Sequence, residues 1–308
     1  MTANAIETEC LTRRFGPRTA VDGLTLAIPA GTVFGFLGPN GAGKTTTVRL
    51  LAGLIAPSSG GARVAGYRLG ERDAALRRAV GILTETPGLY DRLDPWHNLR
   101  FFGRLYGLDD RRVAAQIERY LTIFGLWERR HEPIGGFSKG MRQKVAIARA
   151  LLHEPAVVFL DEPTAALDPE AARTVRDVVK DLRAAGRTIF LTTHNLNEAE
   201  ELCDLIGVFR SRLLRLDTPA GLRASLFGRG TIVRFTGPAA AWAAAAQEAP
   251  GVRAVTANDG ALTVMLDDPE AHNPGLIRAL VAAGAPVRYV EPATGSLEDA
   301  YLALVEGG

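Results

Sequence analysis

One stretch constrains the fold of this chain more than any other, the glycine-rich octapeptide GPNGAGKT at residues 38–45. It follows an apolar, β-favouring run at residues 32–37 and opens onto a helical pattern over residues 45–54. Its three glycines lack a Cβ, so the backbone can curl around an anion and point successive N–H groups at it. The helix N-terminus behind the loop adds unpaired amides and the positive end of its dipole. The order strand, loop, helix therefore predicts a nucleoside triphosphate site.

Two side chains of this stretch have specific expected roles. Lys44 supplies a point charge for the β- and γ-phosphates, and the Thr45 hydroxyl is a ligand for Mg²⁺. The other residues of the stretch are expected to surround the phosphates. The predicted phosphate-binding set is Gly38, Pro39, Asn40, Gly41, Ala42, Gly43, Lys44, Thr45 and Thr46.

The composition excludes several classes of protein. A chain of 308 residues has the length of about two domains of ~100–200 residues each. Its net charge of +2 leaves no electrostatic footprint for nucleic acid. Cys10 and Cys203 are far apart and fit no metal or redox spacing, which indicates a reducing cytoplasm. No apolar run approaches the ~18 residues of a membrane helix. We therefore expect a soluble chain whose role at a membrane, if it has one, comes through a partner.

Strands alternate with helices from the phosphate loop to about residue 226. The apolar runs at residues 156–160 and 188–192 have strand length and are typical of strands buried on both faces. This alternation predicts a mostly parallel sheet with right-handed crossovers. Residues 86–137 instead show helical periodicity and predict a helical insertion. Nearer the N-terminus, the Asp22-Gly23 pair predicts a turn between strands.

The last part of the chain, residues 227–308, forms a second pattern. Its elements follow the order βαββαβ, which is that of a ferredoxin-like sandwich. The expected fold is therefore an α/β phosphate-loop domain over residues 1–226, with its helical insertion at about 86–137, followed by a small α+β domain over residues 227–308. No residue of the small domain suggests chemistry.

Two carboxylates, Asp161 and Glu162, stand at the end of the apolar run at residues 156–160. In a phosphate-loop enzyme the first carboxylate is suited to holding the hydration shell of Mg²⁺. The second is then placed to orient and deprotonate the attacking water as a general base. An ordinary Asp-Glu turn before Pro163 is the alternative, and the phosphate loop makes it the weaker one.

With these residues the chain resembles the ATP-binding cassette (ABC) ATPase family. The phrase FSKGMRQ at residues 137–143 stands where the family has its signature, usually LSGGQ. Residues 166–168 (ALD) match the D-loop, His194 matches the switch histidine, and Phe15 matches the aromatic residue that stacks on adenine. The residue sequence of these motifs, together with the tail GSLED at residues 295–299, further resembles the drug-resistance branch of ABC-2-type exporters.

The resemblance implies a site shared between two copies of the chain. In the family, the signature of one subunit contacts the γ-phosphate of the ATP held by the other, so two ATP molecules lie between two subunits in a homodimer. It assigns nucleotide contacts to Ser138, Lys139, Gly140, Met141 and Asp168. His194 would contact the same γ-phosphate and help to fix the water and Glu162. The implied cofactors are ATP and Mg²⁺.

Two positions depart from the family pattern. Glu85 stands where the family usually has a glutamine, and its carboxylate can still bind Mg²⁺ or water while it adds negative charge beside Glu162. Lys139 replaces the first glycine of the signature, which adds a cation near the phosphates and removes some backbone freedom.

The sequence thus predicts the ATPase subunit of a membrane exporter, held at the cytoplasmic face of the membrane by a separate permease. The permease is expected to dock near Glu85 and on residues 86–106. Two alternatives are a soluble ABC protein acting on the ribosome or on DNA, and a protein that sequesters a ligand without transport. The first usually carries two cassettes or a long coiled coil, and the chain has neither pattern.

Overall fold

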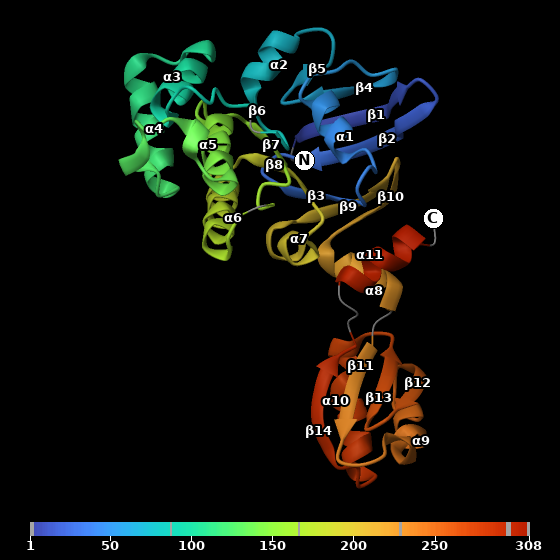
Figure 1. The fold of residues 1–308 in the computed structure, drawn as a ribbon. Helices are drawn as coiled ribbons and strands as arrows, with labels where there is room; N and C mark the ends of the chain where they lie inside the picture. The colour runs from blue at the N-terminus through green and yellow to red at the C-terminus, as the bar shows by residue number, and fades with distance from the viewer. Residues whose placement is uncertain (1–2, 87, 166, 228–229, 294–296, 307–308) are drawn as a thin grey trace. The chain divides into compact units, whose positions relative to one another are not determined.

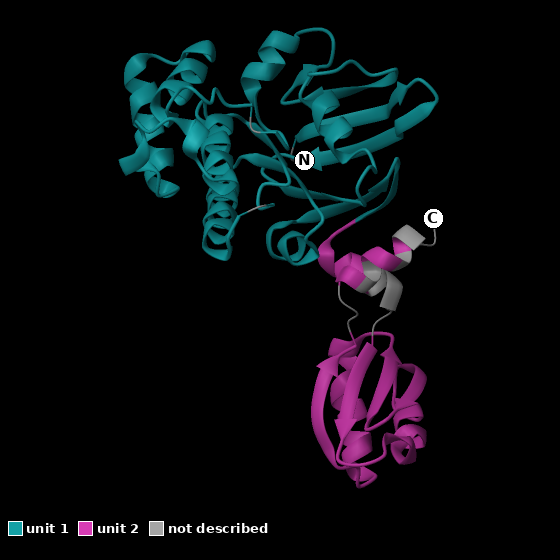
Figure 2. Cartoon of the chain, in the orientation of Figure 1, with its two compact units in different colours: residues 1–216 teal, residues 217–308 magenta. Residues whose placement is uncertain are grey.

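The computed structural model describes residues 3–86, 88–165, 167–227, 230–293 and 297–306, drawn in Figure 1. The chain divides into two compact units, Met1–Leu216 and Asp217–Gly308 (Figure 2). The division falls after residue 216 and not after residue 226, because helix α8 (Pro219–Phe227) is grouped with the second unit. Ala166 of the expected D-loop and Gly295 and Ser296 of the tail lie outside the described residues. Each unit is described by itself below.

A six-stranded sheet forms the centre of the first unit, and five of its strands are parallel neighbours in the order β9-β3-β8-β7-β6. The expected parallel sheet is therefore confirmed. Every residue of β3, β7 and β8 is buried, as is typical of parallel strands covered on both faces. Because these strands run in the same direction, the residues that follow them meet at one edge. The strands are β3 (Val33–Leu37), β6 (Val80–Leu83), β7 (Val157–Asp161), β8 (Thr188–Thr193), β9 (Leu205–Arg210) and β10 (Arg212–Asp217).

A second, antiparallel sheet has the strand order β2-β1-β4-β5. The predicted turn at Asp22-Gly23 is wrong, because β2 continues through both residues. Gly23 has a positive φ of 62°, and the β1–β2 register is irregular opposite it. The pair forms a β-bulge, in which a glycine takes a turn-like conformation without ending the strand. The strands are β1 (Asn4–Phe15), β2 (Arg18–Pro29), β4 (Ser59–Val64) and β5 (Tyr67–Arg68).

Helix α1 (Lys44–Leu51) begins directly after the phosphate loop and contacts strands of both sheets, β2 and β4 on one side and β7 on the other. Its apolar residues Val48, Leu50 and Leu51 belong to one buried cluster that also contains Phe34 and Phe36 of β3. The helix that presents the loop is therefore held by the core of the whole unit.

The segment expected as a helical insertion contains helix α3 (Pro95–Leu105) and helix α4 (Asp110–Ile123). Asp109 caps α4 as expected, since its side chain accepts a hydrogen bond of 2.8 Å from the Arg112 backbone N–H. Helix α5 (Lys139–Leu151) follows and packs against both α3 and α4. Among the described residues, no helix combines the length and apolar character that crossing a membrane requires.

The second unit contains a four-stranded sheet in the order β12-β13-β11-β14. Each neighbouring pair is antiparallel, and helices α9 (Ala243–Gln247) and α10 (Pro269–Ala282) fill the two helical positions of the chain order. This is the expected ferredoxin-like arrangement. The strands are β11 (Gly230–Phe235), β12 (Val252–Asn258), β13 (Ala261–Leu266) and β14 (Val287–Pro292), and α11 (Leu297–Glu306) follows them.

Candidate nucleotide-binding and catalytic site

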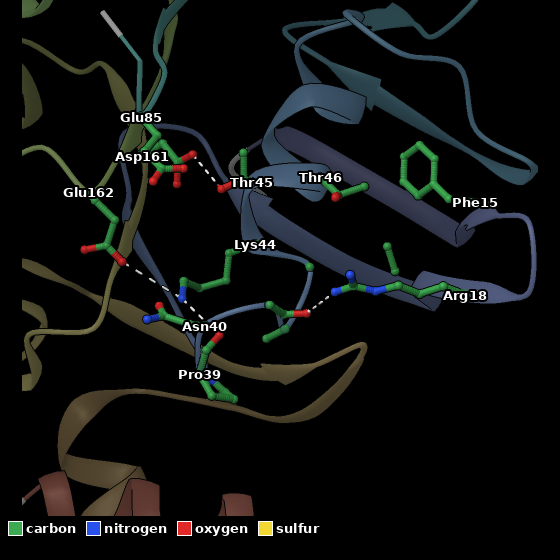
Figure 3. A pocket seen from close by; sticks show the side chains of 14 residues that line it. Phe15, Arg18, Pro39, Asn40, Lys44, Thr45, Thr46, Glu85, Asp161 and Glu162 are labelled. Carbon is green, nitrogen blue, oxygen red and sulfur yellow. Dashed lines mark hydrogen bonds and ion pairs between the residues drawn. The ribbon is translucent and has the colours of Figure 1, made fainter.

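A pocket of about 470 Å³ opens in the first unit at the phosphate loop (Figure 3). It brings together residues that the sequence singled out from four separate stretches. It is lined by Phe15, Arg18, Ala20, Pro39, Asn40, Gly41, Ala42, Gly43, Lys44, Thr45, Thr46, Glu85, Asp161 and Glu162. The phosphate loop, Glu85 and the Asp161–Glu162 pair meet because β3, β6 and β7 are parallel and end at the same edge of the sheet. Phe15 comes from the end of β1 in the antiparallel sheet.

Close backbone approaches explain why the loop needs glycine at two positions. A Cβ on Gly38 would lie 2.2 Å from the carbonyl oxygen of Phe209, and one on Gly43 would lie 2.1 Å from that of Ala20. Gly43 also has a φ of 106°, a backbone conformation that side chains with a Cβ rarely adopt. The loop is thus pressed between β2 and β9, with α1 starting immediately behind it.

Lys44 points into the pocket and is only 7% exposed. Its Nζ donates to the carbonyl oxygens of Gly38 at 2.6 Å and Pro39 at 3.3 Å, and it lies 3.9 Å from Glu162 Oε1. Burial lowers the pKa of Lys44, and the negative charges of Glu162 and Asp161 act in the opposite direction. The side chain is therefore already held over the loop with acidic groups as neighbours.

Asp161 ends β7 and is almost fully buried. Its Oδ2 accepts a hydrogen bond of 2.8 Å from Thr45 Oγ1, and its Oδ1 accepts one from Thr192 Oγ1 at the end of β8. The carboxylate and the Thr45 hydroxyl are hard oxygen donors of the kind that Mg²⁺ prefers, and Glu85 adds a further carboxylate to the same pocket. The chemistry of this donor set fits a magnesium ion.

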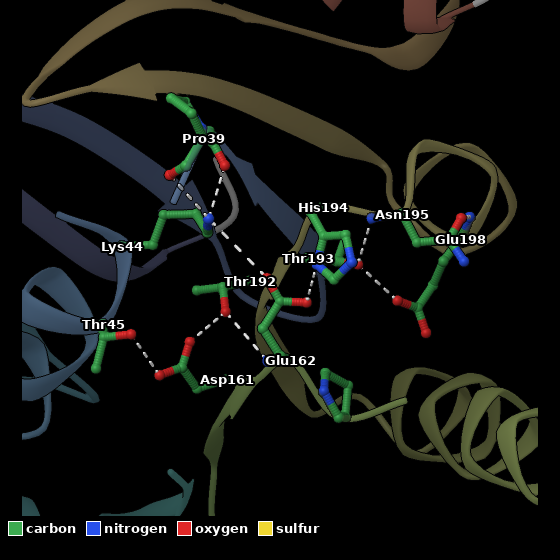
Figure 4. A network of polar contacts seen from close by, with 12 residues as sticks. Pro39, Lys44, Thr45, Asp161, Glu162, Thr192, Thr193, His194, Asn195 and Glu198 are labelled. Atoms are coloured by element: carbon green, nitrogen blue, oxygen red, sulfur yellow. Dashed lines mark hydrogen bonds and ion pairs between the residues drawn. The ribbon is translucent and has the colours of Figure 1, made fainter. Parts of the chain in front are cut away.

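Glu162 follows β7 in a left-handed conformation, with a φ of 52°. Its backbone N–H bonds to the Thr192 carbonyl oxygen at 3.0 Å, which secures this unfavourable conformation. Its Oε2 lies 2.8 Å from His194 Nδ1 (Figure 4). Backbone strain of this kind, about 1–3 kcal/mol, persists where the surroundings hold it and is often found at functional sites. The carboxylate of Glu162 thus lies between Lys44 and His194.

The signature residues lie outside the lining of this pocket. Ser138 caps α5, and its Oγ accepts a hydrogen bond of 3.2 Å from the Met141 backbone N–H. Ser138 and Lys139 are exposed, whereas Gly140 and Met141 are partly buried. The structure therefore does not bring the signature and the phosphate loop together within one chain.

Asp168 has a similar structural position at the start of α6 (Pro169–Ala184). Its Oδ1 accepts a hydrogen bond of 2.8 Å from the Ala171 backbone N–H. This hydrogen bond lowers the pKa of Asp168, with a smaller contribution from the positive charge of Lys144. Asp168 also lies outside the pocket lining, and it is exposed.

Sequence reasoning missed two groups that belong to the site. Arg18 lines the pocket, and its Nη2 donates to the Gly41 carbonyl oxygen at 3.0 Å. It lies close to Phe15 because the two residues are register partners across the β1–β2 turn. A predicted hairpin at this turn would have placed Arg18 beside Phe15 and so at the site. Thr192 was noticed only as part of a strand, although its side chain joins Asp161 to the backbone of Glu162.

Comparison with known proteins connects this geometry to a family. A family model described as ABC transporter matches residues 21–165. The daunorubicin resistance ATP-binding protein DrrA3 of Streptomyces coeruleorubidus is 36% identical over 307 residues, which cover 99% of this chain and 96% of that protein. The chain belongs to the ABC transporter family of ATP-binding proteins. The resemblance drawn from the sequence motifs is confirmed.

Two solved structures agree with this assignment. The ATP-binding subunit of an ABC transporter matches with a TM-score of 0.69 and 32% identity, over 73% of this chain and 94% of that one. The ATP-binding cassette MJ0796, solved as a dimer in a post-hydrolysis state with ADP and Pi, matches with a TM-score of 0.64 and 24% identity, over 69% and 98%. The chain has the ABC ATPase fold and is an ATPase.

Proposed function

We propose that this ATPase powers a membrane exporter of the ABC-2 type, in which a separate permease carries a drug, a lipid or another cargo. One observation supports it above all others. The chain matches the daunorubicin resistance protein over almost its entire length, while Lys44, Glu162 and His194 converge on one site. A phosphate loop alone is common to many enzymes, but this combination is typical of a transporter motor.

In this proposal the pocket holds ATP along its length. Phe15, whose side chain is 47% exposed, offers a ring face for the adenine, and residues 38–46 surround the phosphates. Lys44 contacts the β- and γ-phosphates. Thr45 and Asp161 hold Mg²⁺, with Glu85 on the same pocket wall. A bound Mg²⁺ would neutralise part of the negative charge that develops on the transferred phosphate.

Glu162 is the proposed general base, because its carboxylate reaches into the site beside Lys44. It accepts a proton from the water that attacks the γ-phosphate. His194 fixes the Glu162 side chain through the contact of 2.8 Å and is the proposed partner of the γ-phosphate itself. A base held by a third group is a common arrangement in hydrolytic sites.

The second half of the site is proposed to come from another copy of the chain. Ser138, Lys139, Gly140 and Met141 begin α5 and present amides, a hydroxyl and a cation at a helix N-terminus, where an anion is favoured. Asp168 would face the same junction. Two ATP molecules would then lie between two copies related by a two-fold axis. The dimeric state of the MJ0796 cassette supports this arrangement.

The permease is proposed to dock near Glu85 and on residues 86–106 of the helical insertion, which would hold the chain at the cytoplasmic face of the membrane. Here α3 carries a hollow of about 380 Å³ whose lining includes the exposed apolar side chains of Leu93, Phe101 and Leu105. Tyr90, half exposed, packs edge-on against Phe101. Contiguous exposed apolar side chains rimmed by polar residues are typical of a protein interaction site.

The test is recovery of the partner from native membranes with a tagged chain. We expect a multi-span membrane protein to be retained, and to be lost with Phe101→Asp. Ile123→Asp is the matched control, since Ile123 is also an exposed apolar residue but lies at the end of α4. If no multi-span protein is recovered, and ATP hydrolysis does not respond to a co-expressed permease, the exporter proposal fails in favour of a soluble or ligand-sequestering ATPase.

A further inference from the structure

One buried carboxyl group behind the site has no part in the chemistry described so far. Glu198 lies in the short helix α7 (Leu196–Leu202) and is only 3% exposed. Its Oε2 accepts a hydrogen bond of 2.8 Å from Thr193 Oγ1. Its Oε1 makes no hydrogen bond of normal geometry among the described residues. Burying an acidic side chain that is only partly hydrogen-bonded is costly, so its position requires an explanation.

Two hydrogen bonds connect Glu198 to the turn that carries His194 (Figure 4). Thr193 Oγ1, which donates to Glu198, also accepts the backbone N–H of Asn195 at 3.0 Å. Asn195 Oδ1 in turn accepts the backbone N–H of Glu198 at 3.2 Å. Both neighbours of His194 are therefore hydrogen-bonded to Glu198. Thr193 bonds to the Glu198 side chain, and Asn195 bonds to the Glu198 backbone N–H.

His194 itself depends on this turn for its orientation. Its side chain is 68% exposed, and among the described residues the contact with Glu162 holds the ring. An exposed imidazole loses that contact when its backbone shifts by about 1 Å, since a hydrogen bond needs heavy atoms within about 3.2 Å. Whatever fixes residues 193–195 also fixes the distance from His194 to Glu162.

Burial raises the pKa of Glu198, and the negative charge of Glu162 adds to this effect. The Thr193 and Thr164 hydroxyls and the positive charge of Arg176 lower the pKa, but the net direction is upward. Burial therefore makes this carboxyl group harder to ionise than an exposed one. A neutral acid can accept the Thr193 hydrogen bond without placing a second negative charge behind Glu162. An amide has nearly the same shape and can accept the same bond.

We propose that Glu198 is a positioning residue for ATP hydrolysis, which holds the Thr193–Asn195 turn and thereby the His194–Glu162 contact. The inference rests on the proposed role of His194. It assigns no contact with ATP to Glu198, which instead acts on the rate of hydrolysis through the histidine. Its removal is expected to lower kcat and to leave the KM for ATP nearly unchanged.

The experiment compares four variants of the full chain, namely Glu198→Ala, Glu198→Gln, His194→Ala and the double variant Glu198→Ala/His194→Ala. We expect kcat to fall by about 10²-fold in His194→Ala, the lower end for a positioned acid–base group, and by at least about 10-fold in Glu198→Ala. Glu198→Gln should retain kcat within about threefold, because Gln keeps the acceptor for Thr193. The double variant should be no slower than His194→Ala, because interactions within one network are not additive.

Two controls separate positioning from folding. Asn197→Ala removes an exposed polar side chain of the same helix and should leave kcat unchanged. Thr193→Val keeps the size of the side chain, removes the hydroxyl, and should reproduce the loss in Glu198→Ala. An unchanged Kd for ADP, which lacks the γ-phosphate that His194 is proposed to contact, shows in each variant that the first unit is folded.

Different results overturn different claims. Wild-type kcat in Glu198→Ala beside an impaired His194→Ala would overturn the positioning role alone. A double variant with losses that multiply would also overturn it, since Glu198 would then act independently of the histidine. Wild-type kcat in His194→Ala would overturn both this inference and the proposed role of His194.

Discussion

The two halves of the proposed ATP site differ in how they are held. Glu162 is fixed by its backbone bond to Thr192 and by its side-chain contacts with Lys44 and His194, groups that come from separate elements. Ser138, at the start of α5, has its hydrogen bond within its own helix, to the Met141 N–H. The first half is assembled by one chain. The second half is an exposed helix start that this chain does not bring to the pocket, as expected for groups that act on another copy.

The largest effect should come from the half that one chain assembles. Glu162→Gln keeps the size of the side chain but removes the base, so we expect ATP hydrolysis to fall by about 10²–10⁴-fold with ATP binding retained. Steady-state hydrolysis and equilibrium binding measure the two quantities. Asp177→Asn, a carboxylate on α6 outside the pocket lining, is the control. The Glu162→Gln variant should also dimerise with ATP, and a Glu162→Gln chain that stays monomeric at saturating ATP would contradict the shared-site arrangement.

The exposed half should affect assembly instead. Ser138→Ala removes the cap of α5, a loss of about 1 kcal/mol in stability, and also one of the groups offered to the second ATP. In the Glu162→Gln background we expect ATP-dependent dimerisation, followed by analytical ultracentrifugation, to weaken by about tenfold, since a hydrogen bond to a charged group is worth about 1.5–3 kcal/mol. Asp109→Ala removes the equivalent cap of α4 and should leave dimerisation unchanged. Equal losses in both variants would mean that Ser138 acts only as a cap.

A smaller effect is expected at Arg18, which the sequence did not single out. Arg18→Ala should weaken binding of ATP and ADP by about threefold, because exposed charge contacts contribute below about 1 kcal/mol. Arg63→Ala, which also removes a guanidinium bonded to a backbone carbonyl oxygen, is the control. Titration with a fluorescent nucleotide measures both, and equal affinities for wild type and Arg18→Ala would limit Arg18 to shaping the loop.

The smallest effect concerns Glu198 and how its contribution to the stability of the folded chain changes with pH. Burial raises the pKa of Glu198 above its ordinary value of 4.5, so the folded chain binds more protons than the unfolded one as the pH rises above that value. The stability that Glu198 contributes is present below that value and is lost as the pH rises through the pKa of the folded state. Glu198→Gln cannot titrate, so its Tm relative to wild type should increase toward neutral pH. A difference independent of pH would contradict the raised pKa.

Local patterns predicted much of this fold. The phosphate loop, the buried apolar strands and the order βαββαβ each follow from spacing that depends on neighbouring residues alone. The turn at Asp22-Gly23 failed because a glycine with positive φ suits a bulge as well as a turn, and only the partner strand decides between them. The contact-based division after residue 216 could not be read from local patterns, because the grouping of α8 depends on contacts with α11, far along the chain.

Residues of the candidate site could be predicted where the type of side chain and its spacing in the sequence indicate the chemistry. Residues whose importance depends on their neighbours in the folded chain could not be predicted. Lys44, Asp161 and Glu162 carry recognisable chemistry at recognisable spacing. Thr192 lies within an ordinary strand, and its importance comes from Asp161, which the sheet brings beside it from 31 positions away. Glu198 lies within an ordinary helix, and its importance comes from its burial against the Thr193 hydroxyl. Arg18 became visible only with the register of the hairpin.

The glycine contacts of the phosphate loop affect how tightly the loop can bind nucleotide. Gly38 and Gly43 lie against backbone carbonyl groups of β9 and β2, and Ala42 accepts a hydrogen bond of 2.9 Å from the Ser211 backbone N–H. A loop clamped in this way is preorganised, so little conformational entropy is lost when the phosphates enter. Binding free energy that would otherwise order the loop is then available for the proposed association of two copies of the chain.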